Sequence, residues 1–481
     1  MTMKKLLLVW LLPQLLLTHM SQAQDRWDLK RCVEYAVANN ISVKQSDVQA
    51  RLAALTLQQS KLQQIPTLSL NGNVGYSAGR NQDPNNFSLT TQGYVFNQYS
   101  LQSSVNFFNF NSLRYNTQGN RYALDAANAY TDKLRNDIAL NVANAYLTFL
   151  LNNETAKAAE VKLKQSQAQL ENTRKQVMAG TLPELNAAEL ESQVAQDSSS
   201  YVTALSNIET AILSVKAYMS LDAGTPFLLD TPPVEKIPLD SLVDLQPETV
   251  YALALSNQPQ QKSDEYYIKS ATKFVAATRA AMLPTFSLFG SLGTTFTDQT
   301  LQVESTTQIT TLPIGKVNVA GTDYTVFSNQ TPFLNPNYGK QPYFSQLNQA
   351  FRQQIGLQVN VPILNGGSQR IGYAKSKENL RNYQLQQQLD NLTLKQNIYQ
   401  AYNLASAARQ KFEANKKTLS ATQRSYDYAQ KRYKVGMLNT IDLITNQNNY
   451  FNAQIDLLFS QVDYTFKMKV LEFYKGQGIK L

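Results

Sequence analysis

The sequence has almost none of the residues on which most enzymes and disulfide-stabilised domains depend. Cys32 is the only cysteine, which excludes an internal disulfide and a cysteine-rich metal site. His19 is the only histidine, and it falls within a predicted leader segment. The chain also has no glycine-rich phosphate loop, so it offers no residues suited to catalysis or cofactor binding. We therefore expect no enzyme activity, no catalytic residues, no cofactor and no bound metal.

Long apolar runs are also scarce. Two lysines, an apolar stretch from Leu6 to Leu17 and a small-residue site ending at Ala23 predict a cleaved signal peptide over residues 1–23. A membrane anchor is less favoured, because the stretch is too short for the ~30 Å core of a bilayer. No similar run follows. If the mature chain crosses a membrane, it must therefore do so as β-strands.

Charge of one sign is not concentrated anywhere. Charged residues make up 16% of the chain, and the net charge of +9 falls to +7 once Lys4 and Lys5 are removed with the leader. No cluster of lysine and arginine accompanies this excess, so we expect no nucleic-acid partner. Cys32 follows Lys30 and Arg31, beyond the predicted cleavage site. We interpret it as a small apolar residue on a helix face and not as a site of lipid attachment.

The chain does contain an internal repeat. Residues 65–75 match residues 283–293 at six of eleven positions, a shift of 218. A second block matches at a shift of 256 and pairs Tyr218 with Tyr474. The difference between the shifts places a 38-residue insertion in the second copy. This pattern predicts a first repeat over 24–221, a linker over 222–247 and a second repeat over 248–481.

Each repeat has two segments in which apolar residues alternate with polar, uncharged residues. They surround Leu70, Leu101, Leu288 and Leu357. Each is about 9–11 residues long, enough to cross a bilayer as a tilted strand. A soluble β-sandwich shows the same alternation, but the leader and the long helices favour a membrane barrel. Four strands cannot close a barrel, and lipid does not tolerate open edges, so the chain must oligomerise.

The rest of each repeat is a long heptad pattern. Apolar and small residues step alternately by four and three from Ile138 to Val177, and again from Leu394 to Tyr433. A 3.5-residue period of this length predicts left-handed coiled-coil packing. No strong helix breaker lies between about 368 and 434, a helix of roughly 100 Å.

Both heptad patterns end at a glycine, which predicts a sharp turn between two helices. Gly180 is followed by Pro183, a good first helical residue. Gly436 is followed by Asn439 and Thr440, which can cap a new helix. We therefore expect two helical hairpins whose turns lie far from the strands.

The order of elements resembles the TolC family of outer-membrane efflux proteins over nearly all of the mature chain. One signature is the strand-to-helix junction at 361–367 (VPILNGG), which is degenerate at 105–111 in the first half. The other is the hairpin turn at 432–443 (RYKVGMLNTIDL).

The resemblance implies an α+β membrane protein. Three chains of four strands would form a 12-stranded transmembrane β-barrel, continued by a long α-helical coiled-coil barrel. The homotrimer would lie in the outer membrane of a Gram-negative-type bacterium, in contact with lipid, with its helices in the periplasm. It would be the exit duct of a tripartite efflux or type I secretion system, docked to a periplasmic adaptor protein and an inner-membrane transporter. Substrates would be drugs, metals, small metabolites or exported proteins, and the insertion at about 298–350 would be an extracellular loop.

The resemblance also assigns roles to residues of the hairpin turns. Asp442 matches an acidic ring of the pore, although a carboxylate that favours a helix N-terminus is the alternative. The family often has a second acid one turn later, where this chain has Thr445. Tyr433 matches a tyrosine that helps to close the pore, and Arg432 is a candidate to pair with an acid. A coiled-coil position and a solvated arginine are the simpler interpretations. The expected adaptor-docking residues are Ala179, Gly180, Thr181, Val435, Gly436 and Met437.

A secreted trimeric coiled-coil adhesin, or structural protein without pore activity, is the main alternative. The duplicated alternating strands argue against it. A surface-attached enzyme is the second, and the lack of histidine in the mature chain, of cysteine chemistry and of a phosphate loop argues against it. A stand-alone porin is the third, but it would have no use for helices of tunnel length.

Overall fold

A computed structural model describes residues 26–83, 85, 87–232, 241–309, 311, 313–328 and 333–476. The predicted signal peptide and residues 233–240 of the predicted linker lie outside the described residues. The chain divides into two units. The unit that we call the helical unit comprises Met1–Thr56, Gly119–Thr272 and Glu378–Leu481. The strand unit comprises Leu57–Gln118 and Lys273–Lys377.

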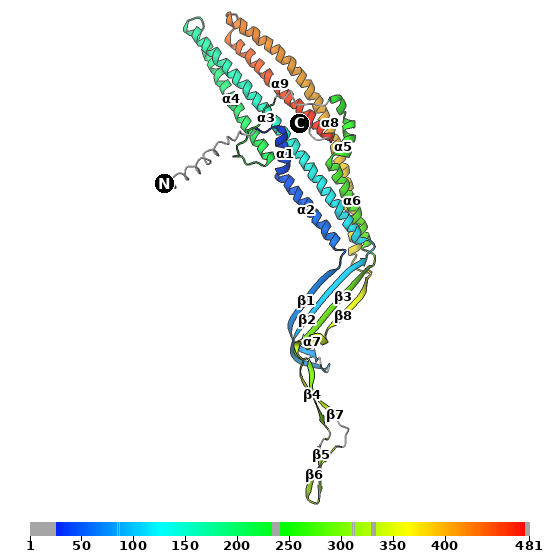
Figure 1. Cartoon of the computed structure of the whole chain (residues 1–481). Helices are drawn as coiled ribbons and strands as arrows, with labels where there is room; N and C mark the ends of the chain where they lie inside the picture. Colours follow the sequence, from blue (N-terminus) through cyan, green and yellow to red (C-terminus); the bar gives the residue numbers. More distant parts are fainter. Residues whose placement is uncertain are drawn as a thin grey trace, which may run out of the picture. The chain divides into compact units, whose positions relative to one another are not determined.

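The same order of helices and strands occurs twice along the chain (Figure 1). The first half contains α1 (Leu29–Asn39), α2 (Ile41–Leu62), β1 (Thr67–Gln82), β2 (Leu89–Phe108), α3 (Ser112–Met178) and α4 (Glu184–Met219). Their counterparts are α5 (Pro247–Asn257), α6 (Pro259–Ala280), β3 (Thr285–Thr297), β8 (Arg352–Asn360), α8 (Ser368–Lys434) and α9 (Thr440–Tyr474). Both bounds of α2 and α6 differ by 218 residues, and both bounds of α3 and α8 differ by 256. The elements therefore follow the two shifts in the sequence, while the domain boundaries remain a prediction.

The two longest helices, α3 and α8, are 67 residues each, which corresponds to about 100 Å. The predicted heptad positions from Ile138 to Val177 and from Leu394 to Tyr433 are all buried or half-buried. Many of them are alanines, which let neighbouring helices approach closely. The burial of these positions agrees with the coiled-coil prediction. Over the described ranges, no helix is both long enough and apolar enough to cross a membrane.

The core of the helical unit contains two clusters that are counterparts in the repeat. Val142 and Val215 belong to the first cluster, and Ile398 and Leu471, each 256 residues later, belong to the second. Cys32 is fully buried in the first cluster, and burial raises the pKa of its thiol to about 12. It therefore remains an uncharged packing residue, as predicted.

The junctions between the short helices are also repeated. The side-chain amide of Asn40 donates to the carbonyl oxygen of Tyr218 at 2.8 Å. The amide of Gln258 donates to the carbonyl oxygen of Tyr474 at 3.2 Å. The first residues of these pairs are related by a shift of 218 and the second by a shift of 256. Both bonds tie the start of a short helix to the end of a hairpin helix.

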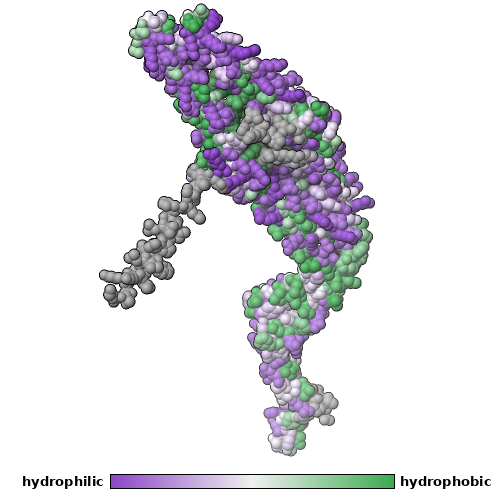
Figure 2. All heavy atoms as spheres, turned by 45° about the horizontal axis from the view of Figure 1, so that its top comes forward, coloured by the Kyte–Doolittle hydropathy of each residue, from purple (hydrophilic) through white to green (hydrophobic). Residues whose placement is uncertain are grey.

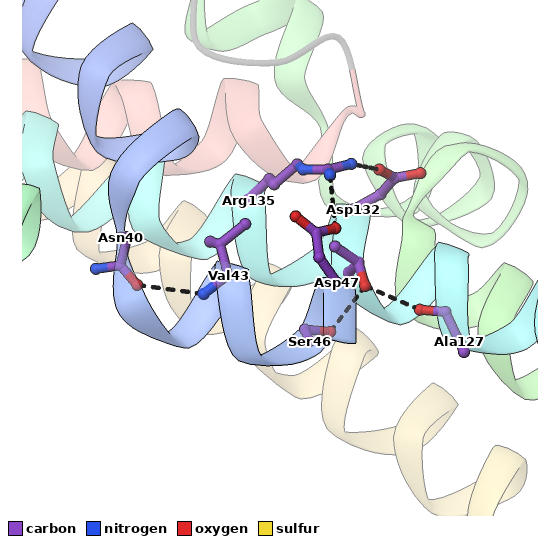
Figure 3. Close-up of polar contacts among 8 residues, drawn as sticks. Asn40, Val43, Ser46, Asp47, Ala127, Asp132 and Arg135 are labelled. Atoms are coloured by element: carbon purple, nitrogen blue, oxygen red, sulfur yellow. Dashed lines mark hydrogen bonds and ion pairs between the residues drawn. The ribbon is translucent and has the colours of Figure 1, made fainter. Parts of the chain in front are cut away.

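Helix α2 is joined to α3 by polar contacts (Figure 3). The hydroxyl groups of Ser46 and Thr131, both buried, lie 2.7 Å apart. The guanidinium of Arg135 in α3 pairs with Asp47 of α2 at 2.9 Å and with Asp132 at 2.8 Å. These contacts fix which face of α2 lies against the longer helix.

The strand unit is built on a four-stranded antiparallel sheet in the order β1-β2-β3-β8. The strands are 16, 20, 13 and 9 residues long. Three of them therefore exceed the predicted 9–11 residues, because their pairing continues beyond the alternating segments. For example, β1 and β2 remain paired to Gln82 and Leu89, next to the turn that joins them.

The predicted loop insertion at about 298–350 contains regular secondary structure. It forms β4 (Leu301–Ile309) paired with β7 (Phe333–Lys340), β5 (Pro313–Val319) paired with β6 (Thr322–Phe327), and helix α7 (Tyr343–Gln349). Alternating residues such as Lys316, Val317, Asn318 and Val319 suit a strand. The sequence analysis predicted no secondary structure for this insertion, and its extracellular position remains a prediction.

Candidate pore elements

The register of the sheet separates apolar from polar side chains. Directly opposed residues point to the same side, so Leu70, Leu101 and Leu292 share one face. This apolar face carries Leu68, Leu70, Val74, Tyr76, Val95, Tyr99, Leu101, Val105, Phe286, Leu288, Leu292, Phe296, Ile355, Leu357 and Val359. The same face also carries the polar residues Asn97, Ser103, Thr294 and Gln353. The polar face carries Thr67, Ser69, Asn71, Asn73, Ser77, Gln98, Ser100, Gln102, Ser104, Asn106, Ser287, Ser291, Thr295, Gln354, Gln358 and Asn360. The exceptions on this face are Tyr94, Phe96, Phe289 and Arg352.

Most of the apolar face is not covered by other residues of the described chain. Leu70 is 74% exposed and Ile355 is 80% exposed. Figure 2 shows hydrophobic atoms gathered over the strands, whereas the helices are mainly hydrophilic. An uncovered face of this size is not stable in water and needs a lipid or protein environment.

Aromatic residues mark both ends of the apolar face. A bulge after Asn106 places Phe108 opposite Phe286, with ring centroids 5.7 Å apart. Ten residues further along β3, Phe296 lies at the other end of the same face. Ten residues span about 33 Å along a strand, or about 25 Å in height at a tilt of roughly 40°. This height matches the apolar band of an outer-membrane strand, flanked by aromatic girdles.

The strand-to-helix junctions have the same backbone in both halves. Gly366 and Gly367 have positive φ angles of 63° and 76°. The residues 256 positions earlier, Phe110 and Asn111, have φ angles of 50° and 65°. The turn therefore needs two left-handed residues, a conformation that favours glycine. This requirement explains why the second-half signature contains two glycines. In the degenerate first half, Phe110 and Asn111 must adopt the same left-handed conformation at a cost in backbone strain.

The turns of the two helical hairpins also share one geometry. After α3, the N–H of Gly180 donates to Val177 and that of Thr181 donates to Gln176. After α8, Gly436 and Met437 make the equivalent bonds to Tyr433 and Arg432. The glycines have φ angles of 72° and 74°. Both helices therefore end in a Schellman motif, in which glycine takes the left-handed position.

The helices that follow the turns begin differently. The side chain of Asn439 accepts a bond from the N–H of Asp442 at 2.7 Å, so Asn439 is the predicted cap of α9. Pro183 does not begin α4 as predicted, because it lies at the capping position with ψ 151° and the helix starts at Glu184. Its fixed φ of −65° suits either position, which is why the sequence did not separate them.

A hollow of about 650 Å³ lies between the two hairpin turns. Thr181, Leu182 and Asn186 line it from the first hairpin, and residues 432–439 and Asp442 line it from the second. The structure therefore brings Arg432, Tyr433 and Asp442 together at this hollow, and their roles in a pore remain predictions.

Tyr433 connects three helices. Its hydroxyl lies 3.2 Å from that of Thr173 in α3 and 3.4 Å from that of Thr440 in α9. Arg432 instead contacts its own turn, since its guanidinium donates to the carbonyl oxygen of Met437 at 3.3 Å. No acid pairs with Arg432 within the residues that the structure describes. The simpler interpretation of Arg432, as a solvated arginine, therefore fits this geometry.

Asp442 is exposed in the first turn of α9, where a carboxylate complements the helix dipole. Its carbonyl oxygen accepts a bond from Asn446, at 2.8 Å. The hydroxyl of Thr445 donates to the carbonyl oxygen of Ile441 within the same helix. Thr445 thus provides no charge next to Asp442. The capping geometry agrees with the alternative interpretation of Asp442 and leaves its carboxylate exposed for a second role.

Sequence reasoning missed a buried polar cluster farther along the hairpins. Asp197 of α4, 1% exposed, pairs with the ammonium of Lys162 at 2.9 Å and accepts a bond from Ser166 at 2.6 Å. The amide of Gln193 donates to Asp197, and that of Gln447 in α9 donates to Ser166 at 3.2 Å. The cluster joins α3, α4 and α9. Ser166, a polar residue at a heptad position, was the available signal.

The comparison with protein families identifies the chain. The model described as outer membrane efflux protein matches residues 33–220 and 335–467. The chain belongs to the outer membrane efflux protein family. Members lie in the outer membrane of Gram-negative bacteria with their helical part in the periplasm, and the predicted location is confirmed.

Individual relatives agree with this assignment. BepC, an outer membrane efflux protein of Brucella suis, is 26% identical over 274 residues, which are 56% of this chain and 49% of BepC. The match therefore spans about half the length of BepC. TtgC of Pseudomonas putida, a probable efflux pump outer membrane protein, is 22% identical over 445 residues, which are 89% of this chain and 79% of TtgC. These relatives are efflux proteins and not enzymes.

Solved structures show the same fold. The CmeC outer membrane channel of Campylobacter jejuni superimposes with a TM-score of 0.71 at 16% identity, over 94% of this chain and 86% of CmeC. The mixed helical and strand architecture predicted from the sequence is thus confirmed at the level of the single chain.

Proposed function

We propose that the protein is the outer-membrane exit duct of a tripartite efflux or type I secretion system. Three chains form a 12-stranded barrel continued by a coiled-coil barrel, and substrates pass through passively. The observation that carries the proposal is the four-stranded sheet, with one exposed, mainly apolar face bounded by aromatic residues and one mainly polar face on which Arg352 is the charged residue. Such a sheet suits lipid on one side and water on the other.

The trimer follows from the edges of the sheet. β1 and β8 each have one neighbouring strand in the described chain, so each leaves a row of backbone groups unpaired. Unpaired backbone groups are very costly in lipid. Pairing of β8 with β1 of the next copy removes both edges, and three copies close a barrel of twelve strands with a lumen. Four strands alone would leave no room for one.

The hairpin turns are the proposed constriction and docking site. Arg432, Tyr433 and Asp442 line the hollow between the turns and would face the pore, with Asp442 forming an acidic ring. The adaptor would contact Ala179, Gly180, Thr181, Val435, Gly436 and Met437. Val435 and Met437 are 66% and 70% exposed, as expected for apolar residues that await a partner. Residues 24–221 and 248–481 would be the two repeats of each protomer, joined by the linker 222–247.

Single-channel conductance of the detergent-purified protein in planar bilayers tests this proposal. We expect a trimer with a small, cation-preferring conductance, because three carboxylates surround one axis. Asp442→Ala should reduce the preference for cations. Asp427→Ala, an exposed acid of α8 outside the hollow, is the matched control and should leave selectivity unchanged.

Two results would count against the duct. One is a folded monomer that needs no detergent. The other is a folded trimer that shows no conductance, either as the wild type or with the turn-loosening substitution Tyr433→Phe.

A further inference from the structure

Helix α7, in the insertion of the second repeat, is held against the apolar face of the sheet. The hydroxyl of Thr294 donates to the carbonyl oxygen of Leu347 at 2.6 Å. The hydroxyl of Tyr343 lies 3.2 Å from the amide nitrogen of Asn97 and 3.3 Å from the hydroxyl of Tyr99. The register places Asn97, Tyr99 and Thr294 on the same side as Leu101 and Leu292. The helix therefore covers the loop end of the apolar face.

Two further contacts fix the orientation of α7. The ring of Tyr343 packs on Phe296, with centroids 4.7 Å apart. The buried side chain of Gln346 accepts a bond from the backbone N–H of Thr297 at 3.0 Å. Tyr343, Gln346 and Leu347 thus form the inner side of the helix.

The opposite side of α7 is exposed and aromatic. Phe344 is 82% exposed, and Phe351, just beyond the helix, is 47% exposed. Phe344 and Asn348 are four residues apart in the helix, which places them on one side. Helix α7 contains no charged residue.

The segment of sequence around α7 has few charges, while the carboxylates of Asp298 and Glu304 approach from other segments, beside Val95 and Gly339. No aspartate or glutamate lies between Asp323 and Glu378, a segment that includes α7 and β8. The exposed Lys340 precedes the helix by three residues. If acyl chains cover Leu101 and Leu292, the level of α7 along the strands is that of the lipid headgroups, which present phosphates.

We propose that α7 is a lipid-binding element, which packs on the lipid side of the barrel and inserts Phe344 into the headgroup region of the outer leaflet. This inference rests on the proposed barrel, since the apolar face must first be the face that lipid covers. Aromatic side chains are favoured at this level of a membrane, and an uncharged helix avoids the cost of burying charge there. The element would set the depth at which the barrel sits.

Spin labelling tests this placement. The only native cysteine, Cys32, is buried and poorly reactive, so a nitroxide attached to Phe344→Cys is free of background labelling. The protein is reconstituted into vesicles of phosphatidylcholine and phosphatidylglycerol. Collisions of the label with oxygen, which concentrates in lipid, are compared with collisions with a water-soluble nickel chelate. Phe344 makes few inward contacts, so this variant should fold.

Three matched positions calibrate the measurement. Ile355→Cys, on the apolar face of β8, should report lipid, and Gln354→Cys, on the polar face, should report water. Tyr324→Cys, 58% exposed in β6, should also report water. We expect the label at 344 to favour oxygen as strongly as the label at 355 or within about threefold of it, and Asn348→Cys to behave in the same way.

The pattern of results separates two failures. If the label at 355 favours oxygen but the labels at 344 and 348 behave like that at 324, the lipid-binding role of α7 is wrong and the barrel stands. If the label at 355 also favours the nickel chelate, the apolar face does not contact lipid and both proposals fail. A label at 344 that neither reagent reaches would show burial against another copy of the chain, which also overturns the proposal.

Discussion

The hydroxyl of Tyr433 lies 3.2 Å from the hydroxyl of Thr173, although 260 residues separate them along the chain. Thr173 is fully buried in α3, and Tyr433 is in the last two turns of α8. This phenol therefore helps to hold the second hairpin against the first, next to the turns that we propose as the constriction.

Tyr433→Phe should loosen this contact without removing the ring from its packing with Tyr426 and Leu443. Loss of one hydrogen bond costs about 1 kcal/mol, which corresponds to a roughly fivefold shift towards separated hairpins. We expect a higher single-channel conductance or open probability. Tyr428→Phe, an exposed tyrosine of the same helix, is the control. Equal conductance in the two variants would show that the Tyr433 hydroxyl does not help to close the pore.

The buried cluster around Asp197 should matter for stability. Asp197→Ala leaves Lys162, whose side chain is 12% exposed, without its partner, and breaking a buried pair in this way costs about 3–5 kcal/mol. Glu160→Ala removes an exposed partner of Lys164 on the same helix and should have no measurable effect. Thermal denaturation in detergent compares the two. Similar melting temperatures would mean that water replaces the lost carboxylate.

Asp264 of α6 should make stability depend on pH. Burial, and then the negative charge of Asp390, raises the pKa of its carboxyl from 3.8 to about 6. The amide of Gln260 donates to both carboxylates, at 2.9 and 3.5 Å. The folded chain therefore holds this proton more tightly than the unfolded chain. The protonated carboxyl of Asp264 therefore stabilises the folded chain below about pH 4, and this contribution is lost as the pH rises to about 6. The free energy of unfolding should fall by roughly 2–3 kcal/mol over this range.

Denaturation at pH 4.5 and 7.5 measures this dependence. Asp264→Asn should be more stable than the wild type at pH 7.5 and should reduce the difference between the two pH values. Asp427→Asn, an exposed acid of α8, should retain the wild-type difference. If Asp264→Asn keeps the wild-type difference in stability between the two pH values, another titrating group causes that difference and the prediction is wrong.

Two glycine substitutions near the start of α8 should have opposite effects. A Cβ atom would meet nothing within 4 Å at either Gly366 or Gly372, so only the backbone distinguishes them. Gly366 has φ 63°, and Gly366→Ala should lower stability by about 1–2 kcal/mol. Gly372 lies within the helix, and Gly372→Ala should raise stability by about 1 kcal/mol. Shifts of the same sign in the two melting temperatures would refute the backbone explanation.

The long elements could be predicted because their signals are local and repeated. The heptads from Leu394 to Tyr433 and the alternation around Leu70 recur along one face of each element. The contacts of Ser166 and Gln447 could not be predicted, since they depend on how residues 281 positions apart meet. Helix α7 escaped prediction for a similar reason. Its seven residues are too few for a period, and bonds to β3 and to Asn97 of β2 hold it in place.

The equivalent turns after Gly180 and Gly436 have a consequence for stoichiometry. In the proposed trimer, six turns of one backbone geometry would surround the axis, in two alternating kinds that differ in side chains such as Thr181 and Met437. A partner that recognises the backbone of the turn would find six binding positions. A partner that recognises Met437 would find three, and each would be flanked by a near copy that it must reject.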